Sequence, residues 1–244
     1  MYWFLSNVTW NWWAAYYPWI VGYGGKILDA GKSTWSDPKT IEAIKAYTDM
    51  WVTHNVAQPL SLDVGGDAFR LGRAAVWTHI PGQRKAVRTD VADKFDWDVQ
   101  LLPKAPDGKH RTGMGAWGLS AYANSKNKEL AYKYVSYLVS PAIQRTMAKN
   151  EAGTPLVKSV AAETDWKTGL PTPPTNIEAF FKGAEDAILP VMDFPAACGS
   201  FYAGELNTSI TAMLEGILRG EKGVEEALAE VDAVTQVCLD ENKE

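Results

Sequence analysis

Residues 115–140 read GAWGLSAYANSKNKELAYKYVSYLVS, and this stretch decides the fold class. The short apolar run 119–123 predicts a strand. Residues 128–139 then repeat apolar side chains at helical spacing, which predicts an amphipathic helix whose apolar side carries Leu130, Tyr134, Val135 and Leu138. Strands mixed with longer helices are typical of α/β proteins.

The same mixture extends in both directions from this stretch. Strands are predicted at 74–78, a compact apolar run, and at 97–101, where apolar and polar residues alternate. Further helices are predicted where apolar residues recur at helical spacing, or where turn and capping residues bound a short segment, namely at 38–51, 68–71, 83–89, from 141 onwards, at 206–217 and at 224–234. The predicted helix at 83–89 has a basic face formed by Arg84, Lys85 and Arg88.

The composition argues against some classes of function and leaves one anomaly. With 244 residues, 46% of them hydrophobic, the chain can build a sizeable core. Its formal net charge of −5 and the lack of any basic block argue against a nucleic-acid partner. Tryptophan is unusually frequent, and five of the eleven Trp fall near the start of the chain: Trp3, Trp10, Trp12, Trp13 and Trp19. Such a cluster needs an explanation beyond ordinary core packing.

The uncharged segment 2–23 raises the question of a membrane or export segment. Its apolar run is interrupted by four polar residues, Ser6, Asn7, Thr9 and Asn11. Trp and Tyr also prefer the membrane interface to the bilayer centre. A signal peptide would need a basic start and an aliphatic core, which this segment lacks. We therefore expect neither a transmembrane span nor an export signal in this chain.

Two cysteines, Cys198 and Cys238, are too few for a disulfide scaffold, and no CxxC motif occurs. In an oxidising compartment they would pair if their Cα atoms come close enough. Otherwise they are two small buried hydrophobic residues. The sequence leaves both alternatives open.

Several apparent catalytic or cofactor motifs lack the context that their chemistry requires. Residues 113–118 spell GxGxxG but lead into a predicted strand, whereas a dinucleotide site needs a helix there. Residues 125–128 spell SxxK without the partner motifs of β-lactamases. The three histidines are isolated, and no zinc-type spacing occurs. No carboxylate pair is marked as an acid and base, although glycosidases also use aromatic clefts. We therefore expect no enzyme activity, no cofactor and no metal.

A series of short motifs carries a family resemblance through its order along the chain. The motifs are Leu71-Gly72-Arg73-Ala74-Ala75-Val76, Pro81-Gly82, Phe95-Asp96-Trp97-Asp98-Val99, Leu102-Pro103, Gly115-Ala116-Trp117-Gly118-Leu119-Ser120, Ser125-Lys126-Asn127-Lys128-Glu129-Leu130-Ala131, Tyr137-Leu138-Val139-Ser140, Ile217-Leu218-Arg219-Gly220-Glu221 and Val224-Glu225-Glu226-Ala227-Leu228. Together they resemble the extracellular solute-binding proteins of family 1. The resemblance covers nearly the whole chain.

The resemblance implies an α/β, periplasmic-binding-protein-like (type II) two-lobe fold whose N-terminal lobe is incomplete here. It assigns residues 1–112 to the second lobe, 113–175 to the first lobe and 176–244 to the second lobe again. The family pattern begins before this chain does, so we expect the opening of the first lobe to be missing. The apolar side of the 128–139 helix should then lack a sheet to pack on. The implied function is binding of a sugar or polyol between the lobes, outside the cytoplasm, and delivery to the permease subunits of an ATP-driven importer.

The chemistry of a sugar indicates which residues would bind it. A pyranose has an apolar face that aromatic rings cover, and a rim of hydroxyls that polar side chains bind. The family places stacking aromatics where this chain has Trp12, Trp13, Tyr16 and Tyr17. The alternative for each is core packing, and several of them must be core.

Four further candidates are implied by position in the family pattern. Gln83 stands where members often have an aromatic, so it either hydrogen-bonds the ligand or is a solvated helix start. Trp117, between glycines, either stacks on the ligand or packs beside a hinge. Phe201 and Tyr202 lie near another stacking position, with helix packing as the alternative. Two other functions stay open, a carbohydrate-active hydrolase and a truncated chain that binds nothing.

Overall fold

The computed structural model describes residues 3–5, 10–62, 67–115, 118–190, 193–201 and 204–242. The chain divides into two compact units, and each is described by itself. Unit 1 consists of Met1–Thr78, Leu101–Gly115 and Phe181–Glu244, and unit 2 of His79–Gln100 and Ala116–Phe180. In the described parts of the chain, no helix is long and apolar enough to span a membrane.

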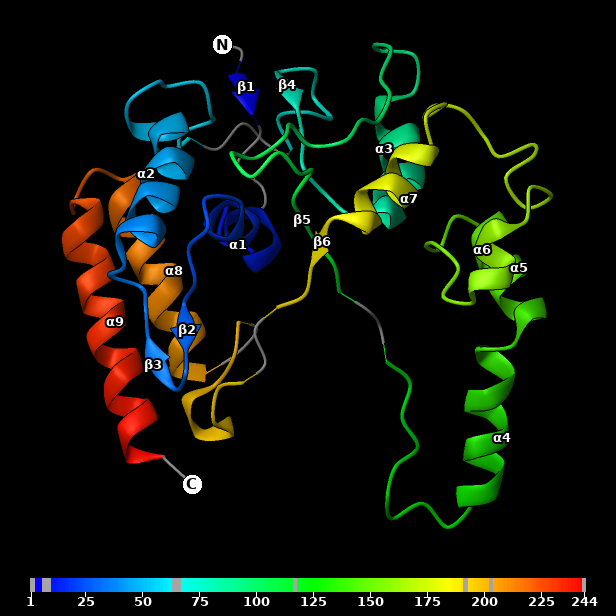
Figure 1. Cartoon of the computed structure of the whole chain (residues 1–244). Coiled ribbons are helices and arrows are strands. Elements are labelled where there is room, and N and C mark those ends of the chain that lie inside the picture. Colours follow the sequence, from blue (N-terminus) through cyan, green and yellow to red (C-terminus); the bar gives the residue numbers. More distant parts are fainter. Residues whose placement is uncertain are drawn as a thin grey trace. The chain divides into compact units, whose positions relative to one another are not determined.

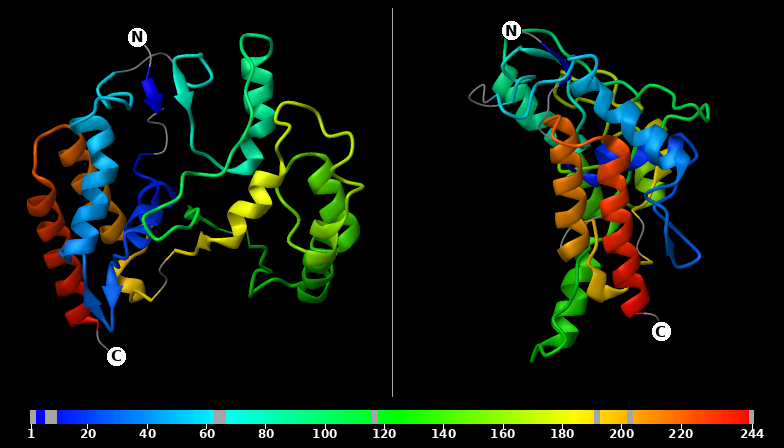
Figure 2. Two further views of the ribbon diagram at one scale, coloured as in Figure 1. Left: turned by 45° about the horizontal axis from the view of Figure 1, so that its top comes forward. Right: turned by 90° about the vertical axis from the view of Figure 1, so that its left-hand side faces the viewer.

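Unit 1 is built on four helices that pack on one another (Figure 1). They are α1 (Trp13–Gly22), α2 (Pro38–Val52), α8 (Gly204–Leu218) and α9 (Val224–Glu241). The helices α8 and α9 run side by side as a hairpin, which both views of Figure 2 show. Gly220 lies between them with a φ of 72°, a left-handed conformation that glycine adopts without strain.

The predicted helix after Asp37-Pro38 is confirmed as α2. Pro38 occupies its first turn, where a missing N–H costs nothing, while the Asp37 side chain makes no capping hydrogen bond. Residues at helical spacing form its buried face, including Ile44, Tyr47 and Trp51. Amphipathic periodicity thus placed this helix correctly.

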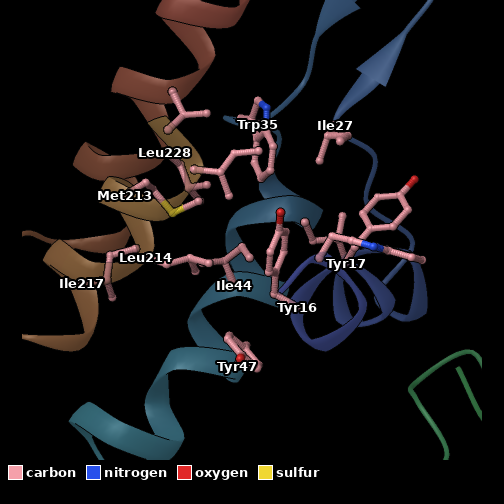
Figure 3. Packing of buried hydrophobic residues seen from close by; sticks show 14 of the residues in the cluster. Tyr16, Tyr17, Ile27, Trp35, Ile44, Tyr47, Met213, Leu214, Ile217 and Leu228 are labelled. Atoms are coloured by element: carbon pink, nitrogen blue, oxygen red, sulfur yellow. The ribbon is translucent and has the colours of Figure 1, made fainter. Parts of the chain in front are cut away.

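The core of unit 1 lies where these four helices meet (Figure 3). Ile44 of α2, Leu214 of α8 and Leu228 of α9 are all fully buried there. The aromatic side chains of α1 enter the same core. The segment 2–23 is therefore in part a buried helix, whose apolar character all round is typical of a helix enclosed by others.

Among the residues of unit 1 that the structure describes, the strands are short and form three pairs. Two pairs are parallel, β1 (Trp3–Leu5) with β4 (Ala74–Val76) and β5 (Thr112–Gly113) with β6 (Ala187–Ile188). The antiparallel pair is the hairpin β2 (Leu28–Asp29) with β3 (Lys32–Ser33). Because these strands are so short, helices dominate the α/β unit.

A disulfide joins Cys198 to Cys238, with their Cα atoms 5.7 Å apart. It ties the short 3₁₀ helix η2 (Ala196–Cys198) to α9. Of the two alternatives that the sequence left open, the structure has the paired one.

Unit 2 contains shorter helices around a smaller set of buried residues. Its elements are η1 (Pro81–Gln83), α3 (Arg84–Val91), α4 (Lys128–Leu138), α5 (Pro141–Lys149), α6 (Lys158–Ala162) and the first residues of α7 (Glu178–Glu185). The buried apolar side chains are Val87, Val91, Ala148, Val160, Trp166 and Ala179. The indole N–H of Trp166 donates a 2.7 Å hydrogen bond to the carbonyl of Val160.

Three elements predicted from the sequence, a helix and two strands, are not found among the residues that the structure describes. Residues 68–71 form a turn, closed by hydrogen bonds from the Arg73 and Ala74 amides to the Ala68 carbonyl, since four residues are too few to nucleate a helix. The stretches 97–101 and 119–123 are not strands, because neither pairs with a neighbouring strand in the described structure.

Candidate ligand-binding site

The aromatic residues at the start of α1 converge with Phe201, which comes from a distant part of the sequence. The rings of Trp13 and Phe201 stack with centroids 6.2 Å apart and planes inclined by 24°. Tyr17 lies 5.4 Å from the same Phe201 ring, and Tyr16 lies 6.2 Å from it. The structure therefore brings four predicted site residues into one cluster around Phe201.

All four members of this cluster are buried. The exposed fraction is 1% for Trp13, 1% for Tyr16, 7% for Tyr17 and 4% for Phe201. A ring enclosed to this extent has no free face for a sugar, so its burial is what the alternative interpretation, core packing, requires. These four side chains form an enclosed aromatic base, so accessible ring surface is to be sought among the residues at its edge.

Trp12 is at that edge. It is half-buried, and its ring meets the ring of Trp13 edge to face, with centroids 6.2 Å apart and planes inclined by 69°. Trp12 immediately precedes α1 in an extended conformation, with φ −80° and ψ 131°. The turn from extended chain to helix thus leaves Trp12 beside the aromatic base while part of its ring surface is accessible.

The phenol groups of Tyr16, Tyr17 and Tyr47, which lie in the core beside Trp12 and Trp13, stay protonated. Burial raises the pKa of Tyr16 well above its usual value, and the neighbouring Tyr47 and Tyr17 phenols raise it further. Burial likewise raises the pKa of Tyr17 and of Tyr47. The Tyr47 hydroxyl donates a 2.8 Å hydrogen bond to the carbonyl of Trp10. These three phenols are therefore uncharged at neutral pH, which suits an uncharged solute better than an ion.

Gly113 holds the cluster in place, a role that sequence reasoning missed. A Cβ added at Gly113 would lie 2.4 Å from the Ala14 Cβ and 3.0 Å from the Trp13 ring carbon Cζ3. Only glycine lets the backbone of β5 approach the first turn of α1 so closely. The sequence showed Gly113 only as the start of a GxGxxG match, and a close approach between distant segments has no local signal.

The remaining predicted site residues lie elsewhere or outside the description. Gln83 ends η1 in unit 2 and is half-buried. Trp117 and Tyr202 lie outside the described residues. That Gln83, Trp117 and Tyr202 contact ligand stays a prediction.

The predicted basic face of α3 is for the most part an internal ion cluster. Arg84 Nε lies 3.0 Å from Glu151 Oε1, and the two terminal nitrogens of Arg88 bind the two Glu151 oxygens at 2.8 and 2.7 Å. Arg88 also donates to the carbonyls of Pro171 and Pro173, at 2.9 and 2.6 Å. The hydrogen bonds from Arg88 lower the pKa of Glu151 and outweigh its burial. Lys85 alone of the three basic residues is exposed.

Among the carboxyl groups that the structure describes, five have a lowered pKa, because hydrogen bonds, in most cases together with a nearby cation, outweigh burial: Asp49, Asp98, Asp107, Glu151 and Glu163. A glycosidase acid needs a raised pKa instead. Among the residues that the structure describes, no group of three His, Cys, Asp or Glu side chains is arranged to hold a metal ion.

Comparison with known proteins gives one family match and a consistent set of relatives. The family model of bacterial extracellular solute-binding proteins matches residues 3–145. The protein named "Probable ABC transporter-binding protein" in Deinococcus radiodurans is 28% identical over 165 residues, which is 63% of this chain and 38% of that protein. The matched stretch thus spans well under half of this relative.

Solved structures share the fold over almost the whole chain. UgpB from Mycobacterium tuberculosis, in complex with glycerophosphocholine, has a TM-score of 0.73 and 20% identity, and the alignment covers 94% of this chain and 55% of that one. An ABC transporter solute-binding protein from Thermotoga lettingae, bound with α-D-tagatose, has a TM-score of 0.71 and 23% identity, covering 93% and 56%. The predicted fold class is confirmed for the part of that fold that the chain spans.

Proposed function

The chain belongs to the family of bacterial extracellular solute-binding proteins, and from this premise we propose that it forms part of a sugar- or polyol-binding component of an ATP-driven importer. Solute would bind between two lobes outside the cytoplasm, and the closed protein would dock on the permease subunits. No covalent chemistry is involved. Residues 1–112 and 176–244 are proposed to form the second lobe, and 113–175 part of the first.

The observation that carries the proposal is the half-buried ring of Trp12 on a fixed aromatic base. Flat rings suit the C–H face of a sugar, and stacking is most effective when the ring is already held in place. The contact between Trp12 and Trp13 and the stack of Trp13 on Phe201 supply that support. Residues 10–25 carry no charged side chain, which favours a neutral ligand over an ionic one.

The ligands of the structural neighbours are compatible with this class but belong to those proteins. One was solved with tagatose, a sugar, and another with glycerophosphocholine. Both are small, hydrophilic solutes, so a ligand screen for this protein should include monosaccharides, oligosaccharides and glycerol-based compounds. Gln83, Trp117 and Tyr202 are proposed as further contacts from other parts of the chain.

The hydrolase alternative is less well supported than binding. Its mechanism needs one carboxyl group held protonated near neutral pH, whereas every carboxyl group with a shifted pKa named above is shifted downward. Incubation with chromogenic glycosides discriminates the two functions, because a hydrolase releases the chromophore and a binding protein does not.

The test is calorimetric titration of a polypeptide that supplies both lobes, with Trp fluorescence as a second readout. Trp12→Ala should weaken binding by about 5- to 100-fold, from lost stacking area, with the fold intact. Trp12→Phe should retain most of the affinity, because it keeps a flat ring. Trp19→Phe, at the other end of α1, is the matched control and should bind like the parent. Binding confined to peptides or metal ions, or an affinity unaffected by Trp12→Ala, would contradict the proposal.

A further inference from the structure

Phe201 supports the aromatic base from a turn and not from a helix or a strand. It ends the described segment 193–201, whose helical part is the three-residue 3₁₀ helix η2. A side chain on a turn is not held by the repeating backbone hydrogen bonds that fix a residue inside a helix. The stack of Phe201 on Trp13 therefore depends on the contacts that hold this segment in place.

The Cys198–Cys238 disulfide ties the segment to α9, and it does so close to Phe201 in the sequence. Cys198 is 3% exposed and Cys238 is half-buried, so the crosslink is largely enclosed by the unit. On the other side, the Phe201 carbonyl accepts a 2.6 Å hydrogen bond from the Asn207 side-chain amide, which belongs to α8. The turn is thus tied to both helices of the α8–α9 hairpin.

Gly199, between the disulfide and Phe201, makes the crosslink important for the position of the ring. Its φ of 85° lies in the left-handed region, where glycine is at ease because it has no Cβ. The same lack of a side chain leaves the backbone at Gly199 free to rotate when its neighbours are not held. An anchor at Cys198 therefore limits the places that the Phe201 ring can reach.

Ring contacts extend from Phe201 to Trp12, the residue proposed to contact solute. Phe201 is buried and stacks on Trp13, and Trp13 in turn meets the half-buried ring of Trp12. Protein interiors are packed as densely as organic crystals, so a buried ring that shifts displaces the rings that it touches. A displacement of the Phe201 turn would therefore reach Trp12 through Trp13.

We propose that the Cys198–Cys238 disulfide positions Phe201, and through it the Trp13 ring that supports Trp12, so that solute affinity depends on the crosslink. The disulfide is a positioning group and does not itself touch solute. A ring already held in its bound position loses less freedom when solute binds, and the affinity is higher for that reason. The positioning rests on the contacts within unit 1, whereas its effect on affinity rests on the proposed function.

A crosslink without this role would act on stability alone. It would constrain the unfolded chain and leave the rings of the folded protein where they are. The two interpretations therefore differ in the folded state, where the environment of each ring can be measured. Leu214→Ala provides the matched control, because it destabilises the same core from α8 and leaves the crosslink intact.

Fluorine NMR of the chain labelled with 5-fluorotryptophan reports on the environment of each indole, and single Trp→Phe variants assign the signals. Removing the crosslink by Cys198→Ser with Cys238→Ser should shift or broaden the Trp13 signal, as should Phe201→Leu, which removes the stacked ring. In Leu214→Ala, the Trp13 signal should move by less than about a third as much, because the Phe201 turn stays anchored.

Trp51 is the internal control within unit 1. Its indole packs on Tyr47 and donates a 3.0 Å hydrogen bond to the Gln58 carbonyl. Its signal should therefore stay in place when the crosslink is removed. The inference is overturned if the Trp13 signal of the double Ser variant stays at its parent position, or if Leu214→Ala moves it as far.

Reduction of the parent keeps the inference testable if the double Ser variant does not fold. Dithiothreitol gives up two electrons and two protons and becomes a cyclic disulfide, while Cys198 and Cys238 become thiols. The Trp13 signal should change as in the double Ser variant, and reoxidation should restore it. A Trp13 signal that is the same in the reduced and the oxidised folded protein would overturn the inference.

A double-mutant cycle tests whether the crosslink acts on affinity through Phe201. The probe is the saccharide that binds most tightly in the calorimetric screen, titrated into the polypeptide that supplies both lobes. Removing the crosslink should weaken binding by about 3- to 30-fold in the parent and by less than about twofold in a Phe201→Leu background, where the ring that it positions is already absent. Equal losses in both backgrounds would overturn the effect on affinity. If no saccharide binds, the proposed function fails and this effect falls with it, while the NMR experiment still decides whether the disulfide positions Phe201.

Discussion

Helix α8 in unit 1 and helix α4 in unit 2 both carry apolar side chains at helical spacing, yet Leu214 of α8 is fully buried and Leu130 of α4 is mostly exposed. The difference lies in their surroundings. Helix α8 packs on α2 and α9, while α4 meets α5 at its end. An apolar stripe therefore predicts which face of a helix is suited to burial. It does not predict that residues of the same chain bury that face.

The two regions also differ in how they are held together. Unit 1 combines a continuous apolar core with a disulfide. Unit 2 has fewer buried apolar residues and relies on the buried ion cluster of Arg84, Arg88 and Glu151. Burial of apolar side chains stabilises the folded state and does not depend on a particular orientation of the groups. A buried ion pair stabilises it only by as much as its attraction exceeds the cost of removing both charges from water. We therefore expect unit 1 to be the more stable region.

Breaking the disulfide should have the largest effect on this contrast. The crosslink closes a segment of 40 residues, and replacing it by Cys198→Ser with Cys238→Ser should cost unit 1 about 4 kcal/mol. The measurement is the urea midpoint followed by Trp fluorescence, since most buried Trp residues belong to this unit. Hydrogen exchange in unit 2 serves as the control and should not change. Equal loss of protection in both units would mean that they unfold together.

The core itself gives the next largest effect. Leu214→Ala should destabilise unit 1 by about 3 kcal/mol, because it removes buried methyl groups and leaves a cavity. The matched substitution Leu130→Ala, on α4, should change stability by less than about 0.5 kcal/mol, since an exposed side chain loses no packing. Urea denaturation of the two variants measures the difference. Similar costs at the two sites would show that α4 is packed as tightly as α8.

The parts of the fold that the sequence predicted correctly are those that depend on patterns between neighbouring residues. The helices α2, α8 and α9 were predicted because their apolar periodicity is a property of a few turns of chain. The strand expected at 97–101 was wrong because a strand depends on a partner far away in sequence. There the Asp98 carboxylate accepts hydrogen bonds from the Thr175 and Asn176 amides, so a loop contact takes the place of a ladder.

The aromatic cluster was predictable in kind, whereas ligand contact by its residues stays a prediction. The sequence indicated that Trp12, Trp13 and Tyr17 belong to one aromatic segment, and the structure packs Trp12 on Trp13 and both Trp13 and Tyr17 on Phe201. The sequence could not show which rings are enclosed, because Phe201 and Gly113, which enclose them, come from remote segments. The ion cluster was missed for the same reason, since Glu151 is far in sequence from the arginines that it binds.

Gly113 offers a smaller and more local test of unit 1. Gly113→Ala places a methyl group 2.4 Å from the Ala14 Cβ, so β5 and α1 must move apart. We expect a loss of about 2 kcal/mol in unit 1, as for overpacked cores. Near-UV circular dichroism, which reports on the ring packing of Trp13, should change as well. The control is Gly118→Ala, where an added Cβ meets nothing within 4 Å. An unchanged spectrum for Gly113→Ala would contradict the close packing of β5 on α1.

The smallest effect should come from Glu151 in unit 2, and it should depend on pH. At neutral pH, Glu151→Gln should cost roughly 1–2 kcal/mol, at the low end for a buried ion pair, because Gln keeps one acceptor oxygen and Arg88 keeps the Pro171 and Pro173 carbonyls. Arg88 lowers the pKa of Glu151 in the folded state, so the native carboxylate binds its proton less readily than the unfolded one. Its contribution is therefore fully present above the unfolded pKa, about 4.3 for Glu, and is lost as the pH falls through the lower folded value. Hydrogen exchange of α3 and α5 between neutral pH and the acid range measures this loss, after correction for intrinsic rates. The parent should lose protection toward acid, and Glu151→Gln should lose less, so that the two converge. Parallel pH profiles in parent and variant would show that Glu151 does not stabilise unit 2 through its charge.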